Sequence, residues 1–188
     1  MRYTAQISES SLSALRMLIG RSIFFVYASC LQVGGQDFTA PSFSIPISDE
    51  IERKWSHRYA VVRCKWHETP RTLTDYWQIL VSDEAKPEGI EVDAGGAIVA
   101  PCTIHFWRST PVQSIEILSS TWAAGEGDDV EEVEFDQALR FRLEDGKAFC
   151  IACRLDGPGV ATEIHISEDE KTIESYLERS TCRLTIGG

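Results

Sequence analysis

Apolar and polar residues alternate along most of this chain, and a period of two predicts β-strands. The alternating segments are also rich in β-branched and aromatic residues, which favour strands. The best of them are YAVVRCKW (59–66), DYWQILVS (75–82), APCTIHFW (100–107) and VQSIEILSS (112–120). We therefore predict a mainly β (α+β) protein with antiparallel sheets in a barrel-like or sandwich-like arrangement, covered by one or two short helices.

The clearest hairpin signal is ALRFRLEDGKAFCIACRL at 138–155. Asp145-Gly146 is a favoured two-residue turn between two alternating runs. Counting outward from that turn gives the expected pairs Leu143–Ala148, Phe141–Cys150 and Leu139–Ala152. One face of the hairpin would then set large residues against small ones. The other face would carry Arg140, Arg142, Phe149, Ile151 and Cys153.

Cys150 and Cys153 have the C-x-x-C spacing of a redox pair or of half a zinc site. Side chains alternate along a strand, so residues three apart lie on opposite faces. No glycine or proline interrupts the strand between Phe149 and Asp156. We therefore predict that both thiols are structural and that they share neither a metal nor a disulfide.

Two segments carry helix-start signals. ISEDEKTIESYLERS (166–180) has Ser167 as the expected N-cap, with Glu170 three residues later at the spacing of a capping box. The segment ISDEIERKW (47–55) is a shorter version with Ser48 as its cap. We predict helices in both places.

The N-terminal region repeats the C-terminal pattern. ALRMLIGRSIFFVYASCLQVGG (14–35) aligns without gaps with ALRFRLEDGKAFCIACRLDGPG (138–159), with seven identical residues. We therefore predict an internal duplication of about 12–55 and 136–178, which flank a middle strand region, 57–121.

The duplication affects the prediction for residues 10–20. Taken alone, they have the pattern of a capped amphipathic helix. Their alignment with the C-terminal hairpin instead favours a strand over 14–19. We prefer the strand and keep the helix as an alternative.

The best candidate linker is AAGEGDD (123–129). It is short and strands are expected to pair across it, so we predict one domain, 1–188.

The charge balance is strongly acidic, with 29 acidic residues against 18 basic ones and a formal net charge of −11. Nucleic-acid binding needs a basic footprint, which this sequence lacks. Arg16 and Arg21 interrupt the first apolar stretch, so neither a secretory signal nor a membrane span is predicted. We therefore expect a cytoplasmic protein with reduced cysteines.

Few residues suggest chemistry. The ligand-like spacings are Cys64–His67, Cys102–His105 and Cys150–Cys153. Residues three apart in a strand diverge, and only Cys64–His67, at a strand end, could bend inward, so we predict no metal and no cofactor. No motif marks a catalytic residue. Candidate partner-binding or ligand-binding residues are the aromatic, histidine and acidic side chains Trp66, His67, Trp77, His105, Trp107, Asp128, Asp129 and Glu131.

The resulting functional prediction is a non-enzymatic cytosolic binding protein. Its acidic, aromatic-bearing surface would take a macromolecular partner such as a basic protein, as an immunity-type protein does. One alternative is a small-molecule-binding β domain with a tryptophan-lined pocket. Another is a Cys/His-dependent enzyme with His67 or His105 as its base. Exposed strand edges leave a homodimer open as well.

Overall fold

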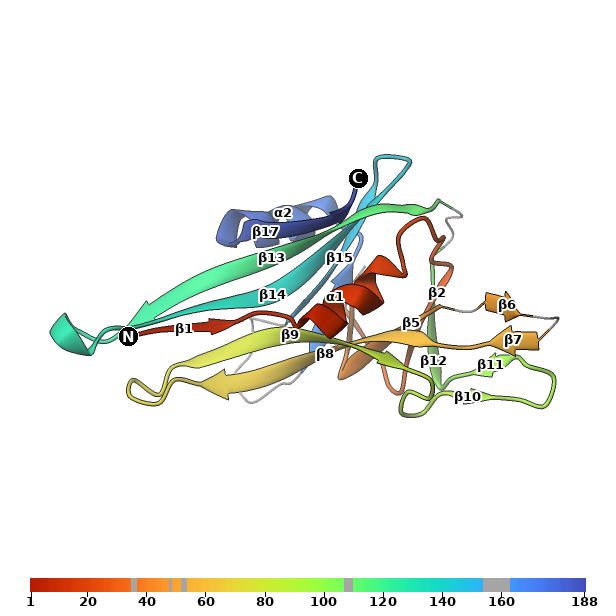
Figure 1. Cartoon of the computed structure of the whole chain (residues 1–188), viewed down its shortest axis with the longest axis horizontal. Coiled ribbons are helices and arrows are strands. Elements are labelled where there is room, and N and C mark those ends of the chain that lie inside the picture. The colour runs from red at the N-terminus through yellow and green to blue at the C-terminus, as the bar shows by residue number, and fades with distance from the viewer. Residues whose placement is uncertain (35–36, 48, 52–53, 107–109, 154–162) are drawn as a thin grey trace.

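The computed structural model describes residues 1–34, 37–47, 49–51, 54–106, 110–153 and 163–188. It confirms a mainly β protein with antiparallel sheets (Figure 1), and two α-helices occur in these residues. In the same part of the chain, neither helix has the length and apolar character needed to cross a membrane.

The larger sheet has eight strands in the order β17-β13-β14-β15-β16-β4-β3, and β1 pairs in parallel with β14. All its other pairs are antiparallel. Its strands are β1 (Arg2–Ala5), β3 (Gln32–Gly34), β4 (Asp37–Ala40), β13 (Val112–Ala124), β14 (Glu131–Leu143), β15 (Ala148–Cys153), β16 (Ile164–Ser167) and β17 (Thr181–Gly187).

The smaller sheet has five strands in the order β12-β2-β5-β8-β9. They are β2 (Phe25–Ala28), β5 (Ser42–Pro46), β8 (Tyr59–Glu68), β9 (Asp75–Glu84) and β12 (Cys102–His105). Two short hairpins extend beyond it, formed by β6 (Asp49–Ile51) with β7 (Lys54–Ser56) and by β10 (Glu91–Val92) with β11 (Ile98–Val99). A 3-10 turn, η1 (Gly127–Asp129), lies between β13 and β14.

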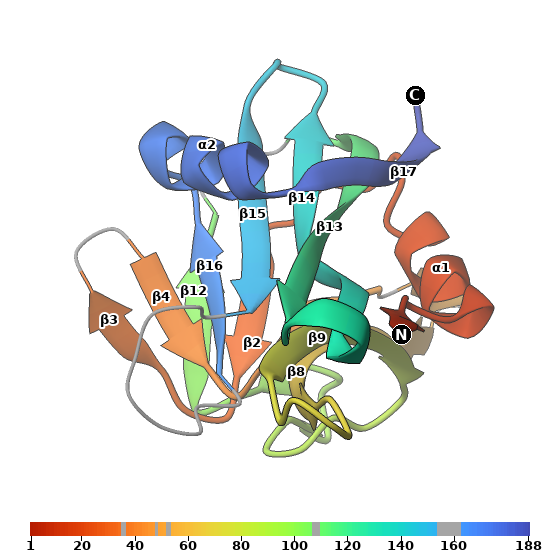
Figure 2. The same ribbon diagram turned by 90° about the vertical axis from the view of Figure 1, so that its left-hand side faces the viewer.

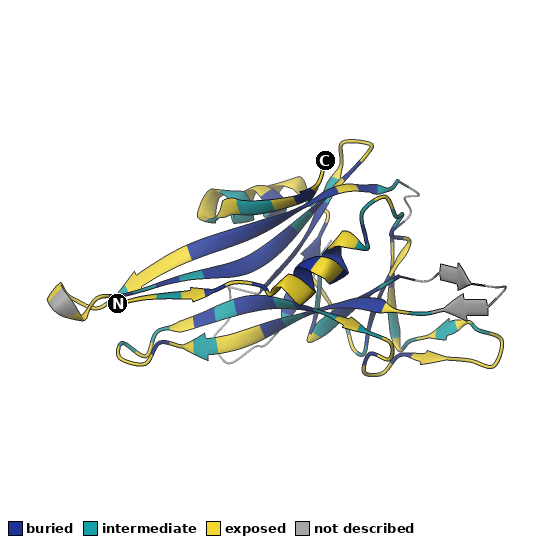
Figure 3. Ribbon diagram, viewed as in Figure 1, coloured by how far each residue is buried: buried dark blue, intermediate teal, exposed yellow. Residues whose placement is uncertain are grey.

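The core lies between the two sheets, where the strands are buried along their middle lengths (Figure 3). Val62 and Ile79 of the smaller sheet belong to the same buried cluster as Phe141 and Ile151 of the larger one. Alternation along each strand supplies these inward residues. One shared core between two sheets is compatible with the sandwich-like alternative.

Each helix covers a different part of the sheets. Helix α1 (Glu9–Arg16) begins at Ser8, whose hydroxyl accepts from Ser11 N, and it packs along the edge strand β9. Helix α2 (Glu170–Arg179) lies on the outer face of the larger sheet, across β15, before the chain returns as β17 beside β13 (Figure 2). There Ile173 packs with Ala138 and Cys150.

A buried carboxylate on β14 links that strand to β17 and to the N-terminal segment. Asp136 is fully buried on β14, and Arg183 of β17 donates to both of its carboxylate oxygens, at 2.8 and 2.7 Å. The Ser119 hydroxyl and Ile7 N also donate to it. The carboxylate is therefore paired and hydrogen-bonded, as burial of a charge requires.

The prediction that Cys150 and Cys153 lie on opposite faces is confirmed. Cys150 packs under α2, whereas Cys153 belongs to the core between the sheets. The predicted pairing of this hairpin is wrong by one residue, because the observed pairs are Arg140–Cys150, Phe141–Phe149 and Leu139–Ile151. Large residues therefore pair with large ones, and the Phe141 and Phe149 rings stack with centroids 4.4 Å apart.

The turn explains this register. Leu143 N donates to Lys147 O at 2.9 Å and Gly146 N donates to Leu143 O at 3.0 Å, so three residues rather than two form the loop. Gly146 has φ +81°, the left-handed conformation that follows a type I turn in a three-residue hairpin loop. As predicted, strands also pair across 123–129, where Ala124 lies opposite Glu131.

The predicted helix over 47–55 is wrong, and Ser48 lies outside the described residues. β6 and β7 instead form a hairpin that continues the register of β5 and β8, from Pro46–Tyr59 to Asp49–Ser56. Pairing of β5 with β8 holds Pro46 and Tyr59, which flank this segment, about 5 Å apart. A nine-residue helix would separate its ends by roughly 12 Å.

Two further predictions about helices need correction. The strand over 14–19 is wrong, because the capped amphipathic alternative forms as α1. The aligned residues 138–143 lie in a strand, so the two segments differ here and the duplication stays a prediction.

The N-cap of α2 is Asp169, which accepts from Thr172 N at 2.9 Å, and not Ser167. Ser167 instead accepts from Asp169 N and is buried in β16.

Candidate functional site

The sequence-predicted site residues fall in two regions. Trp66, His67 and Trp77 lie on the β8–β9 hairpin, which meets the β13–β14 hairpin carrying Asp129 and Glu131 at one end of the molecule (Figure 1). His105 lies far from this end, on β12. Trp107 and the side chain of Asp128 lie outside the described residues.

Glu131 joins the two hairpins and the N-terminal strand. Its carboxylate accepts from Thr72 N at 2.7 Å, from Thr72 Oγ1 at 2.9 Å, from Arg71 N at 3.2 Å and from Tyr3 Oη at 2.9 Å. The residue is 2% exposed. Burial alone would raise its pKa, but the Thr72 and Tyr3 hydrogen bonds lower the pKa of Glu131 to about 2. Glu131 therefore holds the end of the molecule together from inside.

The aromatic residues at this end differ in exposure. Trp66 is 40% exposed, and its indole nitrogen donates to Asp75 Oδ1 at 2.9 Å. Trp77 is half-buried against the core. Trp122 of β13 is 43% exposed and meets the Phe135 ring edge-on. Arg71 pairs with Asp129 at 3.6 Å across the two hairpins.

His67 belongs to the interior of this end. Its ring stacks on Tyr76 with centroids 4.9 Å apart, and its Nε2 lies 3.0 Å from Gln78 Oε1. The amide oxygen accepts, so Nε2 carries the proton. Burial lowers the pKa of His67, although the Gln78 hydrogen bond opposes that shift. The lowered pKa favours the neutral form of His67, which packs against Tyr76.

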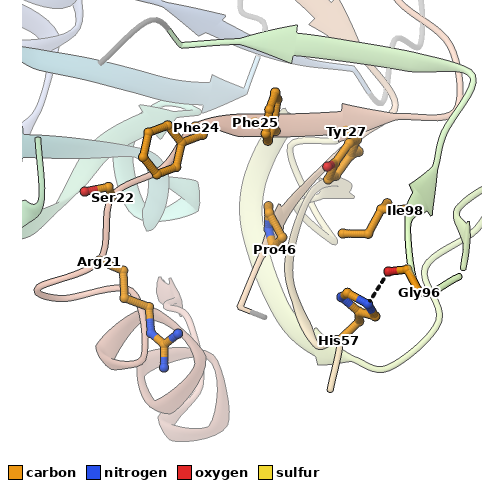
Figure 4. A pocket seen from close by; sticks show the side chains of 9 residues that line it. All are labelled: Arg21, Ser22, Phe24, Phe25, Tyr27, Pro46, His57, Gly96 and Ile98. Carbon is orange, nitrogen blue, oxygen red and sulfur yellow. Dashed lines mark hydrogen bonds between the residues drawn. The ribbon is translucent and has the colours of Figure 1, made fainter. Parts of the chain in front are cut away.

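An aromatic cavity that sequence reasoning missed lies on the outer face of the smaller sheet. Its volume is about 580 Å³, and its walls are mostly apolar (Figure 4). The lining residues are Arg21, Ser22, Phe24, Phe25, Tyr27, Pro46, His57, Gly96 and Ile98. They come from the start of β2, the end of β5, the approach to β8, and the β10–β11 hairpin. This cavity is the candidate functional site.

The aromatic wall follows from alternation along β2. Val26 and Ala28 point into the core, so Phe25 and Tyr27 face outward into the cavity. Phe24 and Phe25 are 45% and 38% exposed, high values for large apolar side chains. Two outward aromatic residues at i and i+2 are the signal that could have identified this wall. The sequence analysis overlooked this signal because the duplication alignment placed residues 25–28 over the predicted strand of the C-terminal hairpin.

His105 lies beside the aromatic wall. It pairs with Phe25 across β12 and β2, and the two rings stack with centroids 4.8 Å apart. His105, proposed from the sequence, thus contacts the side chain of a cavity-lining residue.

Two lining residues of the cavity also belong to a buried cluster. Tyr27 and Ile98 pack in one cluster with Tyr59, Val61 and Ile90. Burial raises the pKa of both Tyr27 and Tyr59, which keeps their hydroxyls protonated at neutral pH. Tyr59 is 1% exposed, and its hydroxyl has no hydrogen-bond partner among the described residues.

One side of the rim is fixed by hydrogen bonds. His57 Nε2 lies 3.0 Å from Gly96 O, which joins the approach to β8 to the β10–β11 hairpin. The carboxylate of Asp93 accepts from Gly95 N and Ala97 N at 2.8 and 2.9 Å and so shapes that turn. The cavity wall that carries Ile98 is therefore supported by the protein itself.

The described residues include no group of three or more His, Cys, Asp or Glu side chains placed to hold a metal ion. Cys64, Cys150 and Cys153 are buried thiols. Burial raises the pKa of Cys150 to about 12, so its thiolate is scarce at neutral pH.

Comparison of the chain with models of known protein families, with curated proteins and with solved structures finds no match. The geometry of the candidate site is therefore the basis for the functional argument. Two features matter most: an apolar cavity rimmed by a few polar groups, and the acidic end, our name for the tips of the β8–β9 and β13–β14 hairpins, which carry the exposed Trp66 and Trp122 together with Asp75, Asp129 and Glu132.

Proposed function

We propose that this protein is a non-enzymatic binding protein that takes a small molecule with an apolar body in the aromatic cavity. The observation that carries the proposal is a cavity of about 580 Å³ whose wall includes the exposed rings of Phe24 and Phe25. Small-molecule sites are commonly apolar, of roughly 300–1,000 Å³, with a few polar groups at defined positions. The expected pocket was lined by tryptophan, whereas this one is lined by phenylalanine and tyrosine.

The test uses two exposed aromatic residues in separate parts of the molecule, Phe25 on β2 and Trp122 on β13. A panel of naphthalene compounds and alkyl compounds, neutral and charged, is titrated into the full chain by isothermal calorimetry. Burial of a Phe side chain is worth about 1.5–3 kcal/mol. Phe25→Ala should therefore weaken binding by roughly tenfold or more. Trp122→Ala, which removes a comparably exposed ring elsewhere, should leave binding unchanged.

Thermal unfolding of both variants shows whether the fold is intact. The proposal is wrong if no compound of the panel binds the wild-type chain. It is equally wrong if binding is the same in Phe25→Ala as in wild type.

A second candidate function is the binding of a basic macromolecular partner at the acidic end. The observation that favours it is the exposure of Trp66 and Trp122 on hairpins that also carry Asp75 and Glu132. Exposed tryptophans are frequent anchors of protein interfaces, and acidic surroundings attract basic partners. Its test is whether binding of such a partner weakens with ionic strength and depends on Trp122.

A further inference from the structure

Two cysteines from different sheets meet in the core. Cys64 lies on β8 of the smaller sheet and Cys153 on β15 of the larger sheet (Figure 2). Val62 and Ile151, which precede them by two residues, belong to the same core cluster as both cysteines, as alternation along each strand requires. The Cys153 thiol is hydrogen-bonded to the Cys64 thiol. Two thiols from distant parts of the chain are therefore in direct contact.

The thiol partner of Cys153 is not its neighbour in the sequence. Cys150 is three residues away, but it packs under α2 on the other face of the larger sheet. Packing of one sheet on the other brings Cys64 to Cys153 instead. Both are free thiols in this structure. The fold thus creates a cysteine pair that no short spacing in the sequence indicates.

The two thiols differ in access and in acidity. Cys64 is 8% exposed, whereas Cys153 is fully buried. Burial, and then the hydrogen bond with Cys64, raise the pKa of the Cys153 thiol, which therefore stays protonated at neutral pH. A small oxidant would reach Cys64 first, and Cys153 would react with the oxidised Cys64 second. A first thiol that meets the oxidant and a second that resolves the product are what disulfide formation needs.

We propose that Cys64 and Cys153 form a reversible disulfide between the two sheets when the protein meets hydrogen peroxide. The Cys64 sulfur attacks the peroxide bond and becomes a sulfenic acid, with release of one water molecule. The Cys153 sulfur then displaces the sulfenic oxygen as a second water molecule, and the S–S bond forms. The two thiol protons end in the two water molecules, and the two electrons lost by the thiols reduce the peroxide.

This inference is independent of the proposed function, because neither cysteine lines the aromatic cavity. The bond would cross-link the two sheets through their shared core. A disulfide between residues far apart in the sequence closes a long loop, which mainly reduces the conformational freedom of the unfolded chain. The oxidised protein should therefore unfold at a Tm roughly 5 °C or more above that of the reduced protein.

The experiment treats the folded full chain with hydrogen peroxide, blocks the remaining thiols after denaturation and maps disulfides by mass spectrometry. The parent protein carries Cys30→Ser and Cys182→Ser, because these are the two exposed cysteines. We expect a linked peptide that joins Cys64 to Cys153, loss of two free thiols, and recovery of both after treatment with dithiothreitol. Thermal unfolding of the oxidised and reduced parent measures the shift in Tm.

Cys150→Ala is the matched control, since it removes a buried thiol from the same strand but from the other face. It should leave both the linked peptide and the rise in Tm intact. Cys64→Ala and Cys153→Ala should each abolish both. Peptide mapping of the parent needs no substitution in the core, so a variant that fails to fold leaves the test intact.

Three results would overturn the inference. Oxidation could link other cysteines, it could stop at an acid on Cys64, or the parent could keep both core thiols after prolonged exposure to peroxide. A rise in Tm that persists in Cys153→Ala would contradict it as well. Binding of small molecules is measured on the reduced protein, so none of these results bears on the proposed function.

Discussion

The Glu131 carboxylate accepts hydrogen bonds from segments that lie far apart in the sequence. Its hydrogen-bond donors belong to the β8–β9 turn and to Tyr3 near the N-terminus. A carboxylate that accepts several hydrogen bonds is stabilised in its charged form, which is why its pKa falls despite burial. The side chain thus contributes stability as long as it is ionised.

We predict that Glu131→Gln destabilises the protein and flattens its response to acid. The folded pKa is about 2 and the ordinary value is 4.5, so the wild-type contribution is complete above 4.5 and is lost as the pH falls toward about 2. A glutamine has one acceptor oxygen and does not ionise. Thermal unfolding between about pH 2 and pH 7 measures both effects.

Glu132→Gln is the matched control, because Glu132 is a neighbouring, partly exposed side chain that pairs with Arg2. It should change the acid response little. If Glu131→Gln unfolds with the same pH dependence as wild type, the carboxylate does not have the role assigned to it.

At the level of elements, the conformation of single turn residues decides how the long strands connect. Gly146 sets the three-residue loop of the β14–β15 hairpin, with φ +81°. Gly125 begins the loop between β13 and β14, with φ +102°. Both are in a conformation that other residues adopt only with strain. They differ in their surroundings, because a Cβ on Gly125 would lie 2.5 Å from Asp129 O, whereas one on Gly146 would meet no atom within 4 Å.

We expect Gly146→Ala to destabilise the protein by about 1–2 kcal/mol, the conformational term alone. Gly125→Ala should lower the free energy of unfolding by roughly a further 1–3 kcal/mol, because its Cβ would clash with the backbone oxygen of Asp129. Gly34→Ala, at an open site without positive φ, is the control and should change stability little. Denaturant unfolding measures all three, and equal values for Gly125→Ala and Gly146→Ala would contradict the steric part.

At the scale of the whole molecule, the two candidate functions occupy separate regions. The aromatic cavity lies on the outer face of the smaller sheet, whereas the acidic end is formed by the tips of the β8–β9 and β13–β14 hairpins (Figure 1). A net charge of −11 acts over the whole surface and accelerates the approach of a basic partner. Salt screens that attraction, so the association rate reports it.

For a basic protein partner, we predict an association rate that falls about tenfold or more from low to high salt. Trp122→Ala should increase the dissociation rate, and Phe25→Ala should not, which reverses the pattern expected for the small-molecule site. Surface plasmon resonance with a purified partner measures both rates. Binding that ignores salt, or that Trp122→Ala leaves unchanged, would contradict this role.

The sequence analysis proposed residues at this end of the molecule and none of the residues that line the cavity. Trp66, His67, Trp77 and Glu131 were proposed from residue type, and pairing of the long strands brings them to one end. The cavity was missed because its walls come from residues 21–27, 46, 57 and 96–98, which no local pattern connects. Only sheet pairing and the β10–β11 hairpin bring those segments together.

The sequence by itself determined the β-rich class, the main strands and the opposite faces of Cys150 and Cys153, since all three depend on a period of two along the backbone. Tertiary structure decided the β14–β15 register and the pairing of β6 with β7, whereas the helix at 9–16 follows the local capping pattern that the duplication argument had set aside. The reason is that a local signal such as Asp145-Gly146 or Ser48 permits more than one conformation. Pairing between distant strands and packing against a shared core then selects the one that buries the most apolar surface.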